Sequence, residues 1–272
     1  KKLKDWQKAV SKTGSFSFAA KLFKKFPQAE IYLVGGAVRD LLLERETKDF
    51  DFVIAKIPAN DLEAFLAQEG EVNLVGKSFG VFKFVPKKNK IDPIDIALPR
   101  TEHADMTGGY RDFEVQSDKD LPIEKDLSRR DFTINALAWD LRNQELIDEF
   151  DGLKDLKSKA IRAIGDPKKR FQEDYTRMLR AIRFFAQLDF SIEAHTLKAI
   201  ADKKEKILTL PKERIGEEFV KIIMSSKAGE AIRLMQAMGL LQILIPELEA
   251  GAGMTQNKAH IYDVFEHSVR AL

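Results

Sequence analysis

The sequence predicts an α+β protein with an N-terminal mixed β-sheet part followed by an all-helical part, and three observations lead to this prediction. Short runs rich in β-branched and aromatic residues lie between residues 31 and 98, and clusters of Gly, Pro and Lys separate them. From Asp126 onward the apolar residues recur at the spacing of amphipathic helices. The length of 272 residues is enough for one or two domains.

The first part of the chain is expected to hold a sheet of about five strands, because each run has the composition of a buried or half-buried strand. The five runs are residues 31–34, 49–55, 72–75, 81–85 and 93–98. Helical patterns cover residues 3–10, 16–26, 37–44 and 61–68. The polar segment 99–122 has no periodicity, so we expect a loop, which at this length is usually functional or disordered.

The second part is expected to consist of helices. A continuous helix over 171–185 would place an apolar stripe on one face, made of Phe171, Tyr175, Met178, Leu179, Ile182 and Phe185. Further helices are expected at 192–202, 212–224 and 228–238. Gly239 is expected to end the last of them. The expected parts of the chain are a head at 1–140, a neck at 141–224 and the start of a helical body at 225–272.

Charge and composition exclude several classes of protein. The 45 Lys and Arg against 43 Asp and Glu give a formal charge of +2, which excludes a globally basic nucleic-acid binder but not a local basic groove. No apolar run approaches the ~18 residues that span a bilayer, and residues 1–10 lack the apolar core of a signal peptide. The absence of Cys excludes disulfides and thiolate metal sites. We therefore expect a cytoplasmic protein without a membrane partner, and the oligomeric state stays open.

Two acidic residues in the second expected strand indicate a metal site. Asp49 and Asp51 are two residues apart, so a strand would point both carboxylates to the same face. Like charges this close repel unless a cation lies between them, and oxygen-only ligands suit Mg²⁺. Asp95, between two isoleucines of a later strand, could add a third carboxylate. Such a site would activate an attacking hydroxyl and stabilise a leaving pyrophosphate, although a lone D-x-D can also be a solvated strand end.

A pair of glycines upstream indicates a phosphate site. Gly35 and Gly36 follow an expected strand and precede an expected helix, which lets backbone N–H groups approach phosphate oxygens. Arg39 is placed to add a charge-assisted contact. Taken alone, a Gly-Gly pair is also compatible with a simple tight turn. Together, the two glycines, the D-x-D after twelve further residues and the distant Asp between apolar residues resemble the nucleotidyltransferase pattern of the DNA polymerase β superfamily.

Three further blocks narrow this resemblance. They are Arg-Arg-Asp-Phe-Thr-Ile-Asn-Ala at 129–136, Glu-Asp-Tyr-Thr-Arg-Met-Leu-Arg at 173–180 and Glu-Arg-Ile-Gly-Glu-Glu at 213–218. With the earlier segments, and over roughly residues 29–245, they resemble the class II tRNA nucleotidyltransferases, or CCA-adding enzymes, and the related bacterial poly(A) polymerases. The resemblance implies a palm-like nucleotidyltransferase head, a helical neck, and a body and tail that hold tRNA. It also implies Mg²⁺ as the cofactor, with tRNA, CTP and ATP as partners.

Asp174 and Arg177 are predicted to select the base. Residues three apart on a helix lie on one face, so both could face a shared cavity beside the apolar stripe. Asp accepts hydrogen bonds and Arg donates them, which matches the edges of cytosine and adenine and opposes those of uracil and guanine. A mismatched base would bury unpaired polar groups at ~1–3 kcal/mol each. The resemblance implies the same roles, and an ordinary exposed ion pair is the alternative.

The resemblance assigns further nucleotide contacts to the block at 129–136. It implies that Asp131 binds the ribose hydroxyls and that Arg130 contacts the nucleotide. Asp is a good acceptor for a 2′-hydroxyl, although an Asp at the start of a helix can instead be a cap. Asn135 is expected to brace the block through backbone hydrogen bonds.

Three other segments carry expectations. Residues 100–122 lie where the resemblance places a flexible loop that helps the switch from CTP to ATP, and the block at 213–218 matches one that is mainly structural in the family.

His260 and His267 would share a helix face and resemble the opening of an HD-type phosphohydrolase domain, whose later His-Asp pair is absent. Because the sequence begins without Met and ends within an expected helix, we expect it to be part of a longer chain.

The sequence thus predicts a template-independent RNA nucleotidyltransferase that adds CMP and AMP from CTP and ATP to the 3′ end of tRNA and releases pyrophosphate. The alternatives are a poly(A) polymerase, an enzyme that adds only CC or only A, and an RNA-binding scaffold without activity. A further alternative is that a C-terminal phosphohydrolase carries the main activity. Asp49→Ala would separate an enzyme from a scaffold, because only an enzyme would lose turnover.

Overall fold

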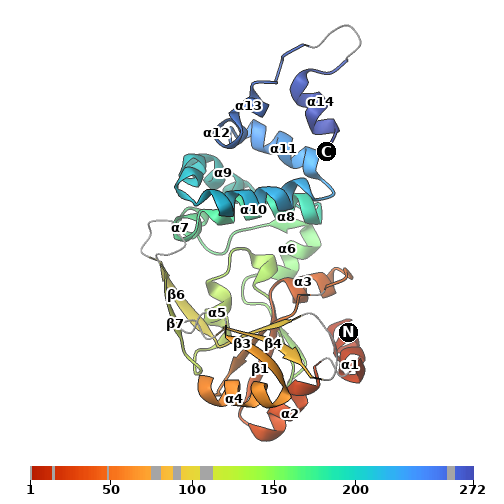
Figure 1. Ribbon diagram of the computed structural model, residues 1–272, viewed down its shortest axis with the longest axis vertical. Helices are drawn as coiled ribbons and strands as arrows, with labels where there is room; N and C mark the ends of the chain where they lie inside the picture. Colours follow the sequence, from red (N-terminus) through yellow and green to blue (C-terminus); the bar gives the residue numbers. More distant parts are fainter. Residues whose placement is uncertain are drawn as a thin grey trace. The chain divides into compact units, whose positions relative to one another are not determined.

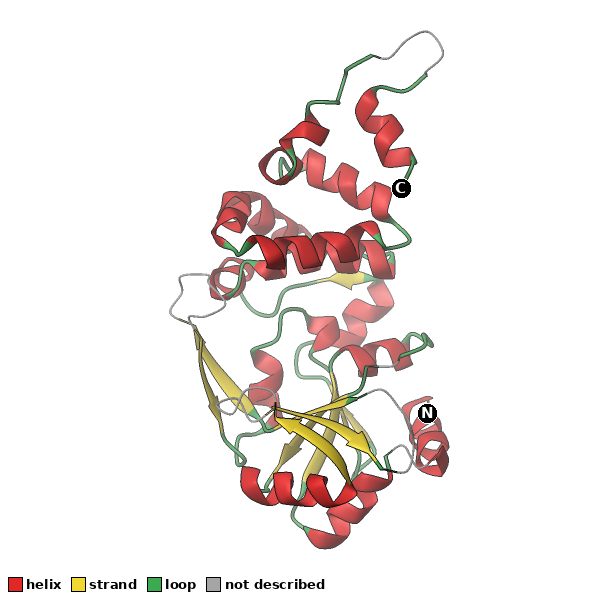
Figure 2. Cartoon of the chain, viewed as in Figure 1, coloured by secondary structure: helices red, strands yellow, loops and turns green. Residues whose placement is uncertain are grey.

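The computed structural model describes residues 2–13, 16–47, 49–74, 81–87, 93–104, 113–255 and 261–272. It contains two compact units, of which the first holds Lys1–His103 and Glu114–Leu156 and the second holds Ala104–Phe113 and Lys157–Leu272. The strands gather mainly in the first unit, and the second is mostly helical (Figure 1, Figure 2). The predicted α+β class is therefore confirmed. None of the described helices has the length and apolar character that a membrane span requires.

A seven-stranded mixed sheet forms the centre of the first unit. From one edge to the other its strands are β3 (Gly70–Leu74), β4 (Val81–Pro86), β5 (Ile94–Ala97), β2 (Asp51–Ala55), β1 (Glu30–Val34), β8 (Ala138–Asp140) and β9 (Glu145–Ile147). Neighbouring strands are antiparallel except β2 and β5, which are parallel. The five expected strands are confirmed as β1 to β5. The sequence does not predict β8 and β9, because runs of three residues are too short to show a period.

Helices α2 and α4 cover one face of this sheet (Figure 1). The helices of the first unit before residue 150 are α1 (Lys2–Thr13), α2 (Ser17–Lys25), α3 (Gly36–Leu42), α4 (Ala59–Glu69), α5 (Ile123–Ser128) and the 3₁₀ helix η1 (Thr133–Asn135). The ring centroid of Phe18 in α2 lies 5.7 Å from that of Phe52 and 5.5 Å from that of Phe84. Because side chains alternate along a strand, the neighbouring Asp51 points to the opposite face. The acidic residues of the predicted site therefore lie on the side of the sheet away from this aromatic core.

Part of the segment expected to be a loop forms strands. β6 (Arg100–Ala104) and β7 (Phe113–Ser117) pair as a separate two-stranded sheet, so the prediction of a loop over 99–122 is wrong in these two stretches. The backbone N–H and C=O groups of each strand form hydrogen bonds with the other strand. This pairing can form without an alternation of apolar residues in the sequence. Residues 105–112 between them lie outside the described part of the chain.

The second unit consists of helices and one small sheet. Its helices are α7 (Pro167–Glu173), α8 (Thr176–Leu188), α9 (Ala194–Lys203), η2 (Lys204–Thr209), α10 (Lys212–Ile223), α11 (Ala228–Ala237), α12 (Leu241–Leu244), α13 (Pro246–Glu249) and α14 (Val264–Arg270). The small sheet is the parallel pair β10 (Ala160–Ile161) and β11 (Ser191–Ile192). Helix α8 packs against α10 and α11 and buries its apolar side there. The three helices expected after residue 190 are confirmed as α9, α10 and α11, and Gly239 follows α11 with the positive φ of 69° that is typical of a helix end.

The apolar stripe around residue 175 belongs to two helices and not to one. Helix α7 ends at Glu173 and α8 begins at Thr176, with Asp174 extended between them at φ −150° and ψ 108°. The Asp174 carboxylate accepts a hydrogen bond from the Thr176 N–H at 2.9 Å, which competes with a continuous helix. The prediction of a single helix is therefore wrong, and Asp174 and Arg177 do not share a helical face in the expected way.

The division between the two units falls later than the sequence predicts. The first unit ends at Leu156, within α6 (Gly152–Ser158), whereas the expected head ends at residue 140. The reason is the hairpin of β8 and β9, which carries the chain on to Ile147 within the head sheet. The second unit contains both the expected neck and the expected body, so their separation stays a prediction.

In the C-terminal segment, the prediction of one helix that contains both His260 and His267 is wrong. Helix α14 begins at Val264, and the Asp263 carboxylate caps it by accepting from the Glu266 N–H at 2.6 Å. His267 is exposed on α14, and His260 lies outside the described residues. The HD-type domain therefore stays a prediction.

Candidate functional site

Two carboxylates lie side by side on neighbouring parallel strands of the first unit. The register of β2 and β5 places Asp51 directly beside Asp95. The Asp95 N–H donates to the Phe50 carbonyl at 3.1 Å, which continues the pairing one residue before β2. Asp49 is exposed and precedes the strand, which begins at Asp51 and not at the expected residue 49. The structure therefore brings Asp95 beside Asp51, as the sequence predicts, with Asp49 at the entrance of the strand.

The pKa of Asp51 shows how these carboxylates influence one another. Burial raises the pKa most, the Arg130 guanidinium lowers it, and the charges of Asp95 and Asp49 raise it, so the pKa lies above its ordinary value. A cation among these oxygens would relieve the repulsion. Within the described ranges, no three acidic or histidine side chains converge closely enough to hold an ion by themselves. A pair of carboxylates suits Mg²⁺, because this ion is usually bound by one or two carboxylates together with substrate phosphates. The metal site stays a prediction.

Gly35 lies against two of the predicted site residues. It has φ 70° and ψ −134°, a conformation that favours Gly. A Cβ at this position would lie 2.6 Å from Nη1 of Arg130 and 3.8 Å from Oδ2 of Asp51. The structure therefore brings the glycine turn, Arg130 and Asp51 together. The Gly35 N–H already donates to the Leu137 carbonyl at 3.1 Å, so a phosphate would have to use other N–H groups of this turn.

Arg39 is bound by other side chains of the protein. Its Nε and Nη2 donate to the two carboxylate oxygens of Asp40 at 2.9 and 3.0 Å, and its Nη1 donates to Oδ1 of Asn135 at 2.7 Å. A Cβ on Gly36 would lie 3.5 Å from its Nη2, and only 9% of Arg39 is exposed. These contacts make Arg39 an anchor of the glycine turn. The phosphate contact that the sequence indicates for Arg39 stays a prediction.

A buried carboxylate holds the two arginines that begin the block at 129–136. Asp126 is fully buried and lies 2.9 Å from Nη2 of Arg129 and 3.4 Å from Nη2 of Arg130. Burial raises the pKa of Asp126, but the two guanidinium groups outweigh this effect, so the pKa lies below its ordinary value. Asp126 is not among the residues predicted from the sequence. Its spacing of three and four residues from the arginines is nevertheless typical of helical ion pairs and could have identified it.

Asp131 and Asn135 bind each other through their side chains. Oδ1 of Asp131 accepts from Nδ2 of Asn135 at 3.1 Å and from the Phe132 N–H at 2.8 Å. Phe132 is the N-cap residue of the short helix η1, so Asp131 lies one residue before the cap position. Asn135 braces the block through its N–H, which donates to the Phe132 carbonyl at 3.0 Å, and also through its side chain, which the sequence does not predict.

Lys83 extends the row of charged residues across the sheet. In the antiparallel pair of β4 and β5 it is the direct partner of Asp95, which is in turn the partner of Asp51. Lys83 is exposed. Two acidic residues and one basic residue therefore cross three strands on the same face. The sequence alone does not identify Lys83, because only the register of the strands places it in this row.

In the second unit, Asp174 and Arg177 each have an ion-pair partner. Nη2 of Arg214 lies 3.5 Å from Oδ2 of Asp174. Arg177 pairs with Glu173, and its Nη1 donates to the Arg170 carbonyl at 3.0 Å. Only 7% of Arg177 is exposed, so the alternative of an ordinary exposed ion pair is wrong for this residue. Arg214 belongs to the block at 213–218, for which the resemblance implies a mainly structural role, and α10 brings it beside Asp174.

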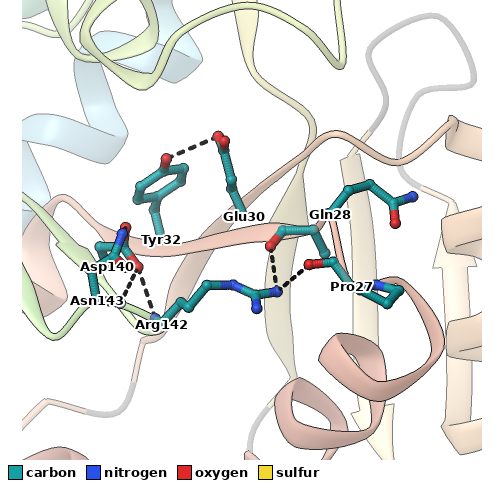
Figure 3. A pocket seen from close by; sticks show the side chains of 8 residues that line it. Pro27, Gln28, Glu30, Tyr32, Asp140, Arg142 and Asn143 are labelled. Atoms are coloured by element: carbon teal, nitrogen blue, oxygen red, sulfur yellow. Dashed lines mark hydrogen bonds between the residues drawn. The ribbon is translucent and has the colours of Figure 1, made fainter.

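A polar pocket of about 260 Å³ lies at the start of β1, the end of the strand opposite to Gly35 (Figure 3). Its lining consists of Pro27, Gln28, Ala29, Glu30, Tyr32, Asp140, Arg142 and Asn143. The Tyr32 hydroxyl donates to Glu30 at 3.0 Å, and Nη2 of Arg142 donates to the carbonyls of Pro27 and Ala29 at 2.8 and 3.0 Å (Figure 3). None of the predicted site residues lines this pocket, and several of its polar groups are hydrogen-bonded to one another. The pocket is therefore separate from the predicted site.

Comparisons with known proteins give one consistent family. Residues 31–162 match the family described as "Poly A polymerase head domain", and residues 189–251 match "Probable RNA and SrmB- binding site of polymerase A". A CCA-adding enzyme of Lactobacillus delbrueckii subsp. bulgaricus is 39% identical over 241 residues, which cover 84% of this chain and 55% of that protein. Poly(A) polymerase I of Haemophilus influenzae is 35% identical over 229 residues, which cover 81% of this chain and 49% of that protein.

The solved structures include a similar fold. The Bacillus stearothermophilus CCA-adding enzyme in complex with CTP matches with a TM-score of 0.72 and 31% identity. The match covers 87% of this chain and 56% of that one. The chain therefore spans about half the length of the relatives that it matches.

Proposed function

Because the chain belongs to the nucleotidyltransferase family that contains the CCA-adding enzymes and the bacterial poly(A) polymerases, we propose that the complete protein adds CMP and AMP to the 3′ end of tRNA. It uses CTP and ATP without a nucleic-acid template and releases pyrophosphate. The observation that supports this most is the pair of Asp51 and Asp95 on parallel strands, with Gly35 and Arg130 beside Asp51. Carboxylates next to a glycine turn and a guanidinium are the groups that a metal-bound triphosphate requires.

The carboxylates of the first unit are assigned to a metal ion. Nucleotidyltransferases generally use divalent metal ions, and we propose Mg²⁺ here because its usual ligands are one or two carboxylates and substrate phosphates. Asp49 and Asp51 would hold the ion, and Asp95, the register partner of Asp51, would assist. When bound, Mg²⁺ lowers the pKa of the attacking 3′-hydroxyl of the tRNA and stabilises the leaving pyrophosphate. Arg130 balances the negative charge of Asp51, as its effect on the pKa of Asp51 indicates.

The first unit also supplies groups for the triphosphate and the ribose. Gly35 and Gly36 have no side chain to keep phosphate oxygens away from the backbone, and Arg39 holds their turn in place. Arg130, whose Nη1 lies beside Gly35, donates hydrogen bonds to the phosphates. Asp131 accepts a hydrogen bond from the 2′-hydroxyl, which favours ribonucleotides over deoxyribonucleotides.

The base is selected by Asp174 and Arg177 of the second unit. An acceptor and a donor at these positions match cytosine and adenine, and they oppose uracil and guanine. The ion pairs with Arg214 and Glu173 hold the two side chains before a nucleotide arrives. This reduces the entropy that base binding would otherwise cost.

A poly(A) polymerase is the second candidate. The 35% identity to poly(A) polymerase I of Haemophilus influenzae supports it. Both activities need the same carboxylates and the same triphosphate contacts, so the first unit cannot separate them. The number and kind of nucleotides added to one acceptor do separate them.

The test is an addition assay with the complete protein and Mg²⁺. The acceptors are tRNAs that end before CCA, after the first C and after the second C, each incubated with one nucleoside triphosphate at a time. We expect CTP to extend the first two acceptors and ATP to add one residue to the third. A long ladder from ATP alone would favour the polymerase, and use of only CTP or only ATP would indicate a partial enzyme. No product with any of the four triphosphates would contradict the proposal.

A further inference from the structure

Asn135 contacts three residues to which the proposed function gives a role. Its Oδ1 accepts a hydrogen bond from Nη1 of Arg39 at 2.7 Å, and its Nδ2 donates to Oδ1 of Asp131 at 3.1 Å. Its main-chain carbonyl accepts from Nη1 of Arg130 at 3.4 Å. Only 6% of Asn135 is exposed. One buried residue therefore joins the anchor of the glycine turn to the residues proposed for the ribose and the phosphates.

The chemistry of the two side-chain partners sets the orientation of this amide. A guanidinium group only donates hydrogen bonds, and an ionised carboxylate only accepts them. The oxygen of Asn135 therefore faces Arg39, and its NH₂ group faces Asp131. Asn offers an acceptor and a donor on two separate atoms, whereas Asp lacks the donor and Leu lacks both.

Asn135 ties the Asp131 carboxylate to another element of the head. The second hydrogen bond to Oδ1 of Asp131 comes from the N–H of Phe132, the next residue in the chain. That bond follows the local backbone and would persist if the block moved as a whole. The bond from Asn135 also lies within the block, but the same amide accepts a hydrogen bond from Arg39 in α3 and so connects the carboxylate to that helix. Asn135 and Arg39 together therefore contribute to the direction of the carboxylate.

We propose that Asn135 is a positioning residue that sets the preference for ribonucleoside over deoxyribonucleoside triphosphates. It holds the Asp131 carboxylate in the direction that accepts a 2′-hydroxyl, and it keeps this carboxylate and the glycine turn in one fixed arrangement. The inference rests on the proposed function, because it requires Asp131 to bind the ribose.

The experiment compares CTP with dCTP in the complete protein, with tRNA that lacks CCA as the acceptor. Asn135→Asp keeps the acceptor toward Arg39 but replaces the donor toward Asp131 with an oxygen that repels it. Asn135→Ala removes both bonds. Asn143→Asp is the matched control, because Nδ2 of Asn143 likewise donates to a carboxylate, that of Asp140, at 2.8 Å in the turn between β8 and β9.

We expect Asn135→Asp to lower the ratio of kcat/KM for CTP to that for dCTP by about 10- to 100-fold, the range that one hydrogen bond to a charged group supplies. Asn135→Ala should lower the same ratio and also raise the KM of both nucleotides, because Arg39 and the glycine turn lose their anchor. Asn143→Asp should leave the ratio unchanged. A residue that only supports the fold would reduce the use of CTP and dCTP alike. An unchanged ratio in both Asn135 variants, with melting temperatures close to that of the control, would therefore overturn the inference.

The wild type and Asp131→Ala distinguish failure of this inference from failure of the proposed function. If the wild type uses neither nucleotide, the proposed activity fails. If Asp131→Ala keeps the preference for CTP, the ribose role of Asp131 fails and the inference fails with it. If Asp131→Ala loses the preference and the Asn135 variants keep it, only the role of Asn135 fails. Where Asn135→Asp does not fold, Asn135→Ala and Asn135→Ser provide the same comparison.

Discussion

Asp51 combines burial with two neighbouring negative charges. It lies beside Asp95 in the register of the sheet and two residues after Asp49, and its pKa is raised by burial first and then by these two carboxylates. A carboxyl group whose pKa is raised on folding contributes stability below its unfolded pKa, and this stability is lost as the pH rises through the folded pKa. At neutral pH the ionised Asp51 is therefore unfavourable for the fold. A residue that lowers stability at neutral pH is typical of a site maintained for function.

We predict that Asp51→Asn keeps or raises the melting temperature of the metal-free protein and removes most of the activity. Asn removes the buried charge and the repulsion from Asp95. The rate of nucleotide addition should fall about 100-fold or more, because a bound metal ion supplies several kcal/mol of transition-state stabilisation. Mg²⁺ with CTP should raise the melting temperature of the wild type but hardly that of the variant.

The control for this prediction is Asp61→Asn, which changes an exposed aspartate on α4. It should leave both the rate and the ligand-dependent melting shift as in the wild type. An Asp51→Asn protein that keeps its rate and its full shift with Mg²⁺ and CTP would contradict the metal assignment.

We predict that Gly35→Ala raises the KM for CTP, whereas Gly165→Ala does not. Both glycines have positive φ, 70° and 69°, which side chains rarely adopt, so Ala introduces backbone strain at either position. At Gly35 the new Cβ would also lie 2.6 Å from Nη1 of Arg130, whereas at Gly165 no described atom lies within 4 Å of it. Urea unfolding measures the strain in each variant, and steady-state kinetics measure the KM. Equal KM values in the two variants would show that Arg130 does not contact the triphosphate.

At the scale of helices and strands, short acidic side chains organise the ends of the helices that carry the site. Asp174 binds the Thr176 N–H and so separates α7 from α8. Asp126, in α5, holds Arg129 and Arg130 just beyond the end of that helix. Both carboxylates act on residues within four positions of themselves. Local hydrogen bonds and ion pairs therefore fix the ends of helices that carry predicted site residues.

We predict that Asp126→Asn lowers the free energy of unfolding at pH 7 by about 2–3 kcal/mol, because it removes the buried partner of two guanidinium groups. The pKa of Asp126 is lowered in the folded protein, so its contribution is complete above the unfolded pKa, about 4, and is lost as the pH falls through the folded value. The difference between variant and wild type should therefore shrink in urea titrations below pH 4.

Asp120→Asn is the control for this pH dependence. Asp120 pairs with Lys119 on the surface, where solvent screens the interaction, so its replacement should change the unfolding midpoint little at any pH. A difference for Asp126→Asn that stays constant from pH 7 to pH 3 would contradict the ion-pair explanation.

At the scale of the whole molecule, the proposed reaction draws on both units. The metal, triphosphate and ribose are assigned to residues of the first unit, and the base is assigned to residues of the second. The family matches follow nearly the same division, with residues 31–162 in one and 189–251 in the other. Changes in the second unit should therefore alter which base is used, while changes in the first should alter the rate of addition or the preference for ribonucleotides over deoxyribonucleotides.

We predict that Arg177→Ala slows addition and lowers the preference for CTP over UTP about tenfold or more, because it removes the donor that opposes the wrong base. Arg233→Ala is the control, since it also breaks an arginine–glutamate pair, with Nη2 of Arg233 2.7 Å from Oε1 of Glu266. Competition assays with all four triphosphates measure the preference. If Arg177→Ala still selected CTP and ATP as the wild type does, side-chain selection of the base would be disproved for this protein.

Much of the site was predictable from the order of residues along the chain. The strands that carry Asp51 and Asp95, the glycine turn and the block around Asp131 all have local patterns of composition and spacing. The errors arose where contacts between distant segments override such patterns. The three-residue strand β8 forms because β1 offers it an edge, and β9 then pairs with β8. The break at Asp174 arose differently, because one carboxylate competes for the N–H of a helix that apolar spacing makes look continuous.

By itself, the sequence determined the α+β class, the order of most strands and helices, and the residue types of the site, since propensity, apolar spacing and motif order are properties of neighbours along the chain. Only the tertiary structure decided that Asp95 and Lys83 stand in one row with Asp51, and that Asn135 joins Arg39 to Asp131. These contacts depend on strand register and on packing between residues as far as 96 positions apart. A local sequence pattern does not predict these contacts, because it does not fix the register of paired strands. A shift of one residue in register would turn every side chain of a strand to the other face of the sheet.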